Sequence, residues 1–305
     1  MSGMPPIVAL VLHFRNATLT RRCLDSLLAD GVRHAVLVDN SQDGGASLSL
    51  LAPWFSSWSD AGFEILVEQP GRNLGFSAGV NRGLAAIHQR HGAVFALLLN
   101  SDAAVRPGAS EALRAALRSV GKPSVAAACM VAQDGRNTPC AYYQQLAGLI
   151  TLEPLPGSHR YLSACCLMLS PDLAFPGLFD EDFFFYGEDI ELGWRLRRRC
   201  VDQLAVAAAL VDHEGSGSSR NGSLFYEYHM ATAHIRLPRK LTGSTVVRVA
   251  MLLLRAFSLP VRATVRSLRF RSAVPWRALV LATADAVAGR NRDLTPPAAE
   301  QGVKE

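Results

Sequence analysis

The 305-residue sequence has few cysteines, and none has the spacing of a metal or redox motif. Its six cysteines include no C-x-x-C pair, and two of them, Cys165 and Cys166, are adjacent. This spacing excludes the common zinc-binding motifs and does not suit a disulfide framework. We therefore expect the protein to work in a reducing, cytoplasmic environment.

The sequence also lacks a long uncharged apolar segment. A membrane-spanning helix needs about 18 or more consecutive apolar residues, and the nearest candidate, 246–261, is interrupted by Arg248 and Arg255. The first ten residues contain no basic region followed by an apolar run, so we expect no secretory signal. Because 49% of the residues are hydrophobic, we expect a globular protein with a substantial core.

Acidic residues are absent from 236–284, although this segment contains ten basic residues. Residues 1–235 carry 18 basic and 22 acidic residues, whereas 236–305 carry 13 basic and 4 acidic residues. The contrast predicts a main domain over 1–235 and a basic amphipathic helical region over 236–290. The remaining residues, 291–305, are predicted to form a disordered tail.

Arginines in the basic region recur at spacings of 7, 7, 4 and 3 residues, which places them near one face of a helix: Arg248, Arg255, Arg262, Arg266 and Arg269. A helix of this kind suits an anionic membrane surface, contacted through 236–284. A helix packed on the main domain with a solvated basic face would give the same pattern, so both interpretations stay open. Few aromatic residues interleave with the arginines, and we expect no nucleic-acid partner.

The main domain alternates short apolar runs with helical patterns. Apolar runs of strand length occur at 7–12, 35–38, 63–67, 94–99 and 125–131, and helical patterns occur at 18–28, 77–88 and 110–119. This alternation predicts an α/β fold with a mostly parallel sheet flanked by helices.

Polar residues directly follow two of the expected strands. Asp39 and Asn40 come after the second run, and Asn100 and Asp102 come after the fourth. Open parallel sheets bind ligands at the carboxyl ends of their strands, so we expect these side chains to line a binding site. The same residue types are also ordinary turn formers, which is the competing interpretation.

The segment 71–83, GRNLGFSAGVNRG, contains four glycines together with Asn73 and Asn81. Its spacing matches neither the dinucleotide-binding G-x-G-x-x-G motif nor the G-K-[ST] phosphate loop. Glycines here allow either a loop that a sugar or diphosphate approaches closely or a helix packed tightly on the sheet.

The segment 179–200, FDEDFFFYGEDIELGWRLRRRC, combines aromatic residues, acids and arginines. Acids followed by arginines suit a helix that starts at Glu188. Apolar surroundings raise the pKa of a carboxylate and make it a better base. We interpret Asp189, supported by Glu188, as the group that takes a proton from an acceptor hydroxyl. The simpler alternative is that these acids only start the helix.

A later strand pattern, 203–211, is followed by Asp212, His213 and a stretch rich in glycine and serine, 215–219. An imidazole at a strand end beside such a loop is a candidate metal or diphosphate ligand. A structural or surface histidine is the equally open alternative.

Five segments resemble those of glycosyltransferase family 2, specifically its bacterial rhamnosyltransferase-like branch, and they occur in the family's order. They are VLVDNSQDGG (36–45), NLGFSAGVNRG (73–83), LLLNSDAAVRPG (97–108), FDEDFFFYGEDIELGWRLR (179–197) and DHEGSGSS (212–219). The resemblance covers most of residues 5–240. It implies a GT-A type, Rossmann-like fold, an inverting mechanism, a nucleotide-sugar donor and Mg²⁺ or Mn²⁺.

The resemblance also implies roles for individual residues. Asp39 contacts the nucleotide, Asp102 ends the metal-binding triplet, Asp189 is the general base, and His213 helps to hold the metal or diphosphate. The full set of donor-binding candidates is Asp39, Asn40, Asn73, Gly75, Phe76, Asn81, Asn100, Asp102 and Arg195. The sequence departs from the family pattern twice: the usual Asp-x-Asp triplet reads Asn100-Ser101-Asp102, and Ala164-Cys165 stands where many relatives have Gly-Ala.

The function implied is transfer of a sugar, best matched by L-rhamnose from dTDP-rhamnose, to a lipid-linked or growing surface polysaccharide. We expect the protein to be cytoplasmic and peripheral on the inner face of the plasma membrane. Two alternatives remain: a UDP-sugar transferase using galactofuranose or N-acetylglucosamine donors, and a non-catalytic protein that binds a glycan or sugar nucleotide. A nucleotidyltransferase is disfavoured because 5–16 contains no basic, glycine-rich loop.

Overall fold

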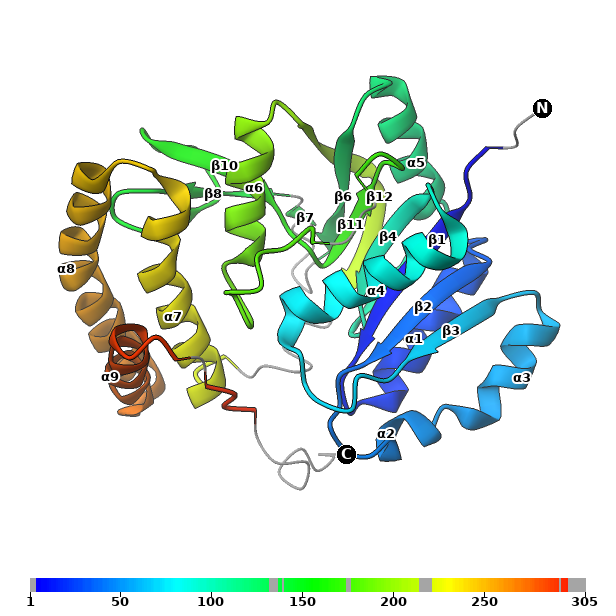
Figure 1. Ribbon diagram of the computed structural model, residues 1–305, viewed down its shortest axis with the longest axis horizontal. Helices are drawn as coiled ribbons and strands as arrows, with labels where there is room; N and C mark the ends of the chain where they lie inside the picture. Colours follow the sequence, from blue (N-terminus) through cyan, green and yellow to red (C-terminus); the bar gives the residue numbers. More distant parts are fainter. Residues whose placement is uncertain are drawn as a thin grey trace.

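The structure is a computed structural model that describes residues 4–131, 137–138, 140–173, 177–213, 221–290 and 292–295. A large mixed sheet forms its centre, with strand order β3-β2-β1-β4-β11-β6-β12-β5 and with β7 paired to β6 (Figure 1). The strands are β1 (Ile7–His13), β2 (His34–Asp39), β3 (Glu64–Glu68), β4 (Phe95–Asn100), β5 (Ala103–Val105), β6 (Ser124–Val131), β7 (Asn137–Thr138), β11 (Cys166–Leu169) and β12 (Asp202–His213).

The first four strands of this order run parallel, as the alternating sequence pattern predicted. Strand β11 then inserts antiparallel between β4 and β6, and β5 pairs antiparallel with β12. The predicted α/β class, with a mostly parallel sheet flanked by helices, is confirmed.

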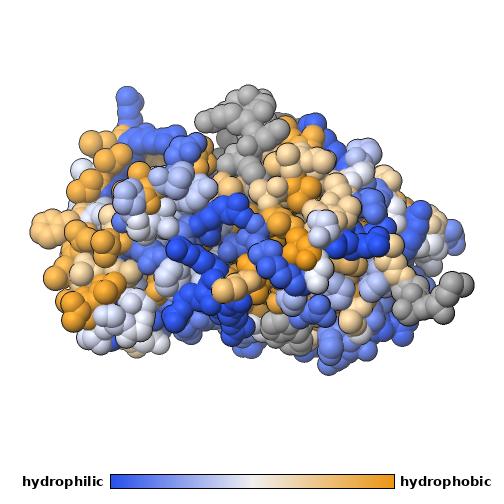
Figure 2. Space-filling view, turned by 90° about the horizontal axis from the view of Figure 1, so that it is seen from above, coloured by the Kyte–Doolittle hydropathy of each residue, from blue (hydrophilic) through white to orange (hydrophobic). Residues whose placement is uncertain are grey.

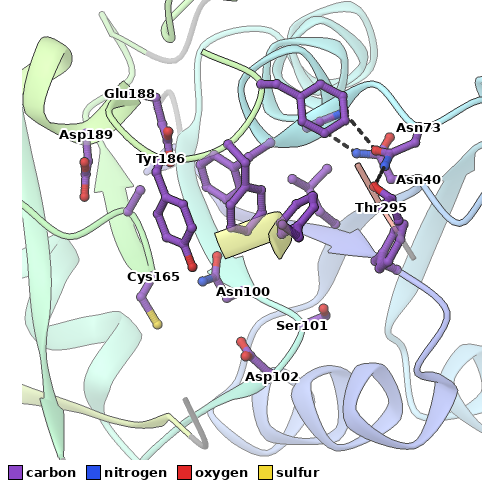
Figure 3. A pocket seen from close by; sticks show the side chains of 18 of the residues that line it. Asn40, Asn73, Asn100, Ser101, Asp102, Cys165, Tyr186, Glu188, Asp189 and Thr295 are labelled. Carbon is purple, nitrogen blue, oxygen red and sulfur yellow. Dashed lines mark hydrogen bonds between the residues drawn. The ribbon is translucent and has the colours of Figure 1, made fainter. Parts of the chain in front are cut away.

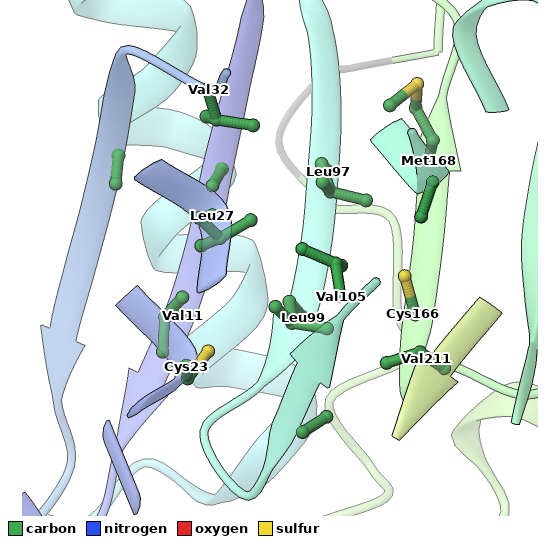
Figure 4. Packing of buried hydrophobic residues seen from close by; sticks show 14 of the residues in the cluster. Val11, Cys23, Leu27, Val32, Leu97, Leu99, Val105, Cys166, Met168 and Val211 are labelled. Atoms are coloured by element: carbon green, nitrogen blue, oxygen red, sulfur yellow. The ribbon is translucent and has the colours of Figure 1, made fainter. Parts of the chain in front are cut away.

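Helices cover both faces of the sheet. They are α1 (Ala17–Ala29), the short α2 (Ala46–Ser49), α3 (Ala52–Asp60), α4 (Gly75–His91), α5 (Ala109–Val120) and α6 (Glu188–Arg198). One core cluster joins α1, α3 and α5 to the sheet, and Figure 4 shows Cys23 and Leu27 of α1 packed near Val11, Leu97 and Leu99. A second cluster joins α4 and α6 to the opposite face.

The glycines of α4 allow that helix to pack tightly on β1. A Cβ atom added at Gly79 would lie 2.9 Å from Leu12 Cδ2, and one added at Gly83 would overlap Leu10 Cδ1. Both leucines belong to β1. Of the two interpretations of the glycine-rich segment, close helix packing therefore accounts for Gly79 and Gly83.

A second, smaller sheet is formed within residues 140–162. This sheet has the order β10-β8-β9, built from β8 (Cys140–Gln144), β9 (Leu149–Thr151) and β10 (Ser158–Leu162). Its buried Tyr143 and Tyr161 pack with Ile190 of α6 and with Leu237. The small sheet therefore links α6 to the helices that follow.

Three helices follow the main sheet: α7 (Leu224–Leu241), α8 (Thr245–Phe270) and α9 (Val274–Val287). They form a separate group beside the sheet layers (Figure 1). Helix α7 is continuous across 235/236, the position predicted as the boundary between the main domain and the basic region. Of the predicted tail, 292–295 are described and contact the rest of the chain, whereas 291 and 296–305 lie outside the described residues.

The row of arginines on α8 does not form a solvated basic face. Arg255 is only 2% exposed, and Arg262 and Arg266 both pair with the buried carboxylate of Glu227 on α7. The helix does pack on the main body of the protein, through these arginines together with Met251, Leu259 and Ala263. Within the described part of the chain, no helix has the length and apolar character needed to cross a membrane.

Candidate active site

A cavity of about 260 Å³ lies at the carboxyl ends of the parallel strands. Asn100, Ser101 and Asp102 reach it from the end of β4, and Asn73, Gly75 and Phe76 reach it from the start of α4. The wall is completed by Phe184–Tyr186, Glu188, Asp189, His213 and Phe225 among others. Figure 3 shows how the labelled members of this set lie around the cavity: Asn73, Asn100, Ser101, Asp102, Tyr186, Glu188 and Asp189. Segments that are far apart in the sequence therefore converge at the carboxyl ends of the strands, which is where the sequence predicted a binding site.

Asp102 and His213 form a pair in this cavity, with Asp102 Oδ1 and His213 Nε2 3.2 Å apart. The side chains are 14% and 25% exposed, respectively. Strand pairing explains the contact, because β5 and β12 run antiparallel and place His213 opposite Ala103. Both residues predicted to serve a metal are thus brought together.

The Asp102–His213 pair supplies a carboxylate and an imidazole, which is a partial ligand set for a divalent cation. The described residues contain no group of three or more His, Cys, Asp or Glu side chains placed to hold a metal ion. Mg²⁺ and related ions are commonly held by one or two carboxylates together with water and substrate phosphates. The pair therefore fits an ion that arrives with a diphosphate and does not fit an all-protein cage.

Asp189 and Glu188 begin α6 and both line the cavity. Burial raises the pKa of Asp189 to about 6, while the N–H of Ile190, which donates to Asp189 Oδ1 at 2.8 Å, partly opposes this shift. Burial, with the neighbouring Asp189 charge, raises the pKa of Glu188 well above its usual range. Glu188 Oε2 is buried and has no hydrogen-bond partner. With a pKa of about 6, Asp189 is ionised at neutral pH, and burial beside that charge disfavours ionisation of Glu188.

The aromatic segment before these acids forms an apolar wall, as the sequence predicted. The Phe185 and Phe225 ring centroids lie 5.3 Å apart, and Phe184 stacks on His229 at 5.2 Å. The chain turns into α6 through Gly187, whose φ of +96° suits glycine. A Cβ atom there would lie 2.8 Å from that of Ala233, so the turn also packs against α7.

Asparagines hold the opposite rim of the cavity. Asn40 Nδ2 donates to the carbonyl of Gly75 at 2.8 Å, and Asn73 Oδ1 accepts from the N–H of Gly75 at 2.9 Å. Gly75 has φ +75°, and a Cβ atom there would lie 2.5 Å from the carbonyl oxygen of Phe184. Asn73 Nδ2 also donates to Thr295 Oγ1 at 3.0 Å (Figure 3). The start of α4 is thereby fixed against both the acidic and the C-terminal segments.

Three predicted donor-binding residues do not line the cavity. Asp39 is 7% exposed and accepts from the N–H of Ser41. Asn81 bonds to both backbone groups of Phe179, and Arg195 pairs with Glu191. Asn81 and Arg195 thus hold the chain that leads to the catalytic candidates, and a donor-binding role for these three residues stays a prediction.

Several lining residues had no clear sequence signal. Phe14 follows β1, Phe225 lies in the first turn of α7, and Thr295 lies in the segment predicted to be a disordered tail. Cys165, noted only as a departure from the family pattern, also lines the cavity. The stretch 214–219, which follows His213, lies outside the described residues.

Comparison of the sequence with protein-family models and with curated proteins finds no match. Many solved structures are similar in fold, among them the following two. One is GalNAc-T7 with UDP, GalNAc and Mn²⁺, at TM-score 0.54 and 13% identity over 84% of this chain and 55% of that one. The other is the mannosyltransferase PcManGT from Pyrobaculum calidifontis with GDP-Man and Mn²⁺, at TM-score 0.55 and 15% identity over 98% of this chain and 79% of that one. The chain thus spans just over half of the first of these proteins. The two likenesses show that it has a GT-A fold.

Proposed function

We propose that the protein is an inverting glycosyltransferase that moves a sugar from a nucleotide-sugar donor to an acceptor hydroxyl. The observation that carries the proposal is the convergence of two chemical groups on one cavity: Asp189, with its raised pKa, and the Asp102–His213 pair. The fold neighbours with UDP or GDP-Man and Mn²⁺ support the same class of reaction.

Asp189 would act as the general base. With a pKa of about 6, the carboxylate is ionised at neutral pH. This pKa also lies close to the working pH, which makes the carboxylate an efficient proton acceptor. The acceptor hydroxyl would give this proton to Asp189 as its oxygen bonds to the anomeric carbon, and the bond from that carbon to the diphosphate would break. Burial and the Asp189 charge raise the pKa of Glu188 beside it, which disfavours a second negative charge in the site.

Asp102 and His213 would hold the diphosphate end of the donor. A bound Mg²⁺ or Mn²⁺ supplies positive charge that stabilises the leaving diphosphate. Asn100 and Ser101, which directly precede Asp102, add polar groups to the same cavity wall. The triplet differs from the usual Asp-x-Asp because Asn100 replaces the first acid. Asp102 is therefore its single carboxylate.

The donor we favour is dTDP-L-rhamnose, with transfer to a lipid-linked or growing surface polysaccharide. The resemblance to the rhamnosyltransferase-like branch of glycosyltransferase family 2 supports this choice. The cavity wall adds a physical reason, because its aromatic side chains include Phe76, Phe184, Phe185 and Phe225. A sugar with a methyl group at C6 suits such a wall better than one with a hydroxymethyl group, whose hydroxyl would lack a partner.

Donor binding and turnover by the purified protein test this proposal. Thermal shift would be measured with dTDP-rhamnose, UDP-galactofuranose and UDP-N-acetylglucosamine, each with and without Mn²⁺. We expect the largest Mn²⁺-dependent rise in melting temperature with dTDP-rhamnose, and release of dTDP when an acceptor extract is added. Binding without release from any donor would instead indicate a non-catalytic sugar-nucleotide-binding protein.

A further inference from the structure

Helix α8 presents apolar side chains to solvent along its whole length. These residues, called here the outer face, are spaced three or four apart: Val246, Val249, Leu253, Phe257, Val261, Val265 and Leu268. Their exposed fractions run from 48% at Val249 to 80% at Val246, and Phe257 is 78% exposed. This spacing places all seven on one side of the helix.

The opposite side of α8 carries arginines that are bound inside the protein. The guanidinium of Arg255 donates to the hydroxyl of Tyr143 and to the carbonyls of Gln145, Leu146 and Met251. Arg262 and Arg266 neutralise Glu227, whose side chain is 0% exposed.

The buried side of α8 also contains Met251, Leu259 and Ala263, so the helix is apolar on both its inner and its outer side. An ordinary surface helix has one apolar side, which faces the core. Because the inner side already packs on the fold, the outer face is a second apolar surface that is exposed to solvent.

The surface around the outer face is basic and carries an aromatic residue suited to a lipid boundary. Arg239, Arg269, Arg271 and Arg277 are exposed, and the segment 236–284 contains no acid. On α9, Trp276 is 41% exposed, and tryptophan is enriched at membrane–water interfaces. Figure 2 shows apolar side chains gathered at the end of the molecule where Figure 1 places α8.

The turn between β8 and β9 adds apolar surface beside α8. Ser258 of α8 donates to the carbonyl of Ala147, which fixes this turn to the helix together with the Arg255 contacts. Leu146, Leu149 and Ile150 are 42%, 47% and 44% exposed, respectively. The exposed apolar area is therefore wider than one helix.

We propose that the outer face of α8 docks on an anionic phospholipid bilayer, with the helix lying in the plane of the interface. Valine, leucine and phenylalanine side chains would enter the acyl boundary, and each large one that leaves water would favour partitioning by about tenfold or more. The surrounding arginines would meet lipid phosphates. This corrects the sequence-based interpretation, because the α8 arginines that were expected to face the membrane are largely used inside the fold.

A second copy of the chain is the main competing occupant, and charge disfavours it. A two-fold interface through the outer face would place the same surface of each copy against the other. Such an interface would bring two basic surfaces together, with no acid from 236–284 to offset Arg269, Arg271 and Arg277. An anionic bilayer offers the complementary charge instead.

Docking would also orient the cavity. Helix α7 begins at the cavity wall with Phe225 and packs against α8 and α9 through Tyr228 and Ala231. An acceptor carried on a lipid would then approach from the membrane to which α8 is bound. This consequence rests on the proposed function, whereas the docking itself does not.

The test is co-sedimentation of the full chain with vesicles of phosphatidylcholine alone or mixed with phosphatidylglycerol. We expect binding to the mixed vesicles, and a loss of about tenfold or more in the double variant Leu253→Asp/Phe257→Asp. Both side chains are exposed, so its melting temperature should match that of the parent protein. The matched control is Leu50→Asp, an exposed leucine (62%) outside α8, which should bind like the parent.

A second variant separates the charge contribution. Arg269→Ala/Arg271→Ala/Arg277→Ala should lose binding to the mixed vesicles and should also weaken its dependence on salt. Equal binding of the parent protein to both vesicle types, or unchanged binding of the Leu253/Phe257 variant, would overturn the proposal. The proposal would also be overturned if sedimentation velocity showed that the parent protein is a dimer and the Leu253/Phe257 variant is a monomer, while vesicle binding stayed the same. Because no donor or turnover is involved, these outcomes are independent of the proposed transferase activity.

Discussion

Asp102 and His213 lie with their side-chain oxygen and nitrogen 3.2 Å apart because β5 and β12 pair antiparallel at the end of the central sheet. Their contact places a carboxylate and an imidazole on the wall of the same cavity that Asp189 lines. We therefore propose that Asp102 and His213 act on the donor diphosphate, whereas Asp189 acts on the acceptor hydroxyl.

Asp102→Asn should weaken Mn²⁺-dependent donor binding by about tenfold or more, because the triplet then has no carboxylate left. Isothermal titration with the donor, with and without Mn²⁺, measures the change. Asp212→Asn is the matched control, since Asp212 pairs with Arg106 on the surface and precedes His213 directly. Equal Mn²⁺ dependence in the parent and in Asp102→Asn would remove Asp102 from the metal site.

Glu188→Gln should keep most of the transferase activity. Burial raises the pKa of Glu188 well above its usual range, which favours the protonated carboxyl group, and the amide of glutamine has a similar shape and no charge. Initial rates at saturating donor would check this. If Glu188→Gln instead lost activity as severely as a substitution of Asp189, Glu188 would be the base.

The rate of transfer should rise with pH below about 6 and then level off. Asp189 must be ionised to accept a proton, and its pKa is raised to about 6. A profile of kcat/KM against pH, with the donor held at low concentration, reports this ionisation in the free enzyme. A profile that stays flat down to pH 5 would mean that Asp189 is not the titrating group.

The same shift has the opposite sign for stability. Asp189 binds its proton more tightly in the folded protein than at its ordinary pKa of 3.8, so folding is favoured at low pH. The free energy of unfolding should therefore fall as pH rises from about 4 to about 6. In Asp189→Asn this part of the pH dependence should shrink in urea melts, with the contribution of Glu188, whose pKa is also raised, left in place. An unchanged pH dependence would assign the shift to a group other than Asp189.

Gly83→Ala should destabilise the protein by about 1–3 kcal/mol, because the added methyl group overlaps Leu10 in a packed core. Gly243→Ala, between α7 and α8, is the control: a Cβ atom there meets nothing within 4 Å. Its effect should stay within about 1 kcal/mol in either direction. Chemical denaturation of both variants measures the difference, and equal stability would contradict the close packing of α4 on β1.

Local patterns in the sequence were sufficient to predict much of the fold and part of the site. Asn100 and Asp102 follow a wholly apolar run, and the carboxyl end of a buried strand is a position that periodicity alone identifies. The aromatic segment before Glu188 could likewise be recognised as apolar surroundings for the acids, because its aromatic residues are adjacent to them in the sequence. These features depend on neighbours in the chain.

Features that depend on distant pairing could not be predicted. Helical spacing placed the α8 arginines on one face, but only the buried Glu227 and the turn at 145–147 decide that this face turns inward. The contact between Asn73 and Thr295 also joins residues that are 222 positions apart, and composition predicted a disordered tail around Thr295. No periodic pattern encodes such contacts.

Asp189→Asn gives the most direct test of the proposed chemistry. Donor binding by titration calorimetry and sugar transfer to acceptor would be measured on the same preparation, with Glu188→Gln as the control. The account predicts that donor affinity stays within about threefold while transfer falls by about 10²–10⁴-fold, the usual contribution of a general base. Transfer at the parent rate by Asp189→Asn would contradict it.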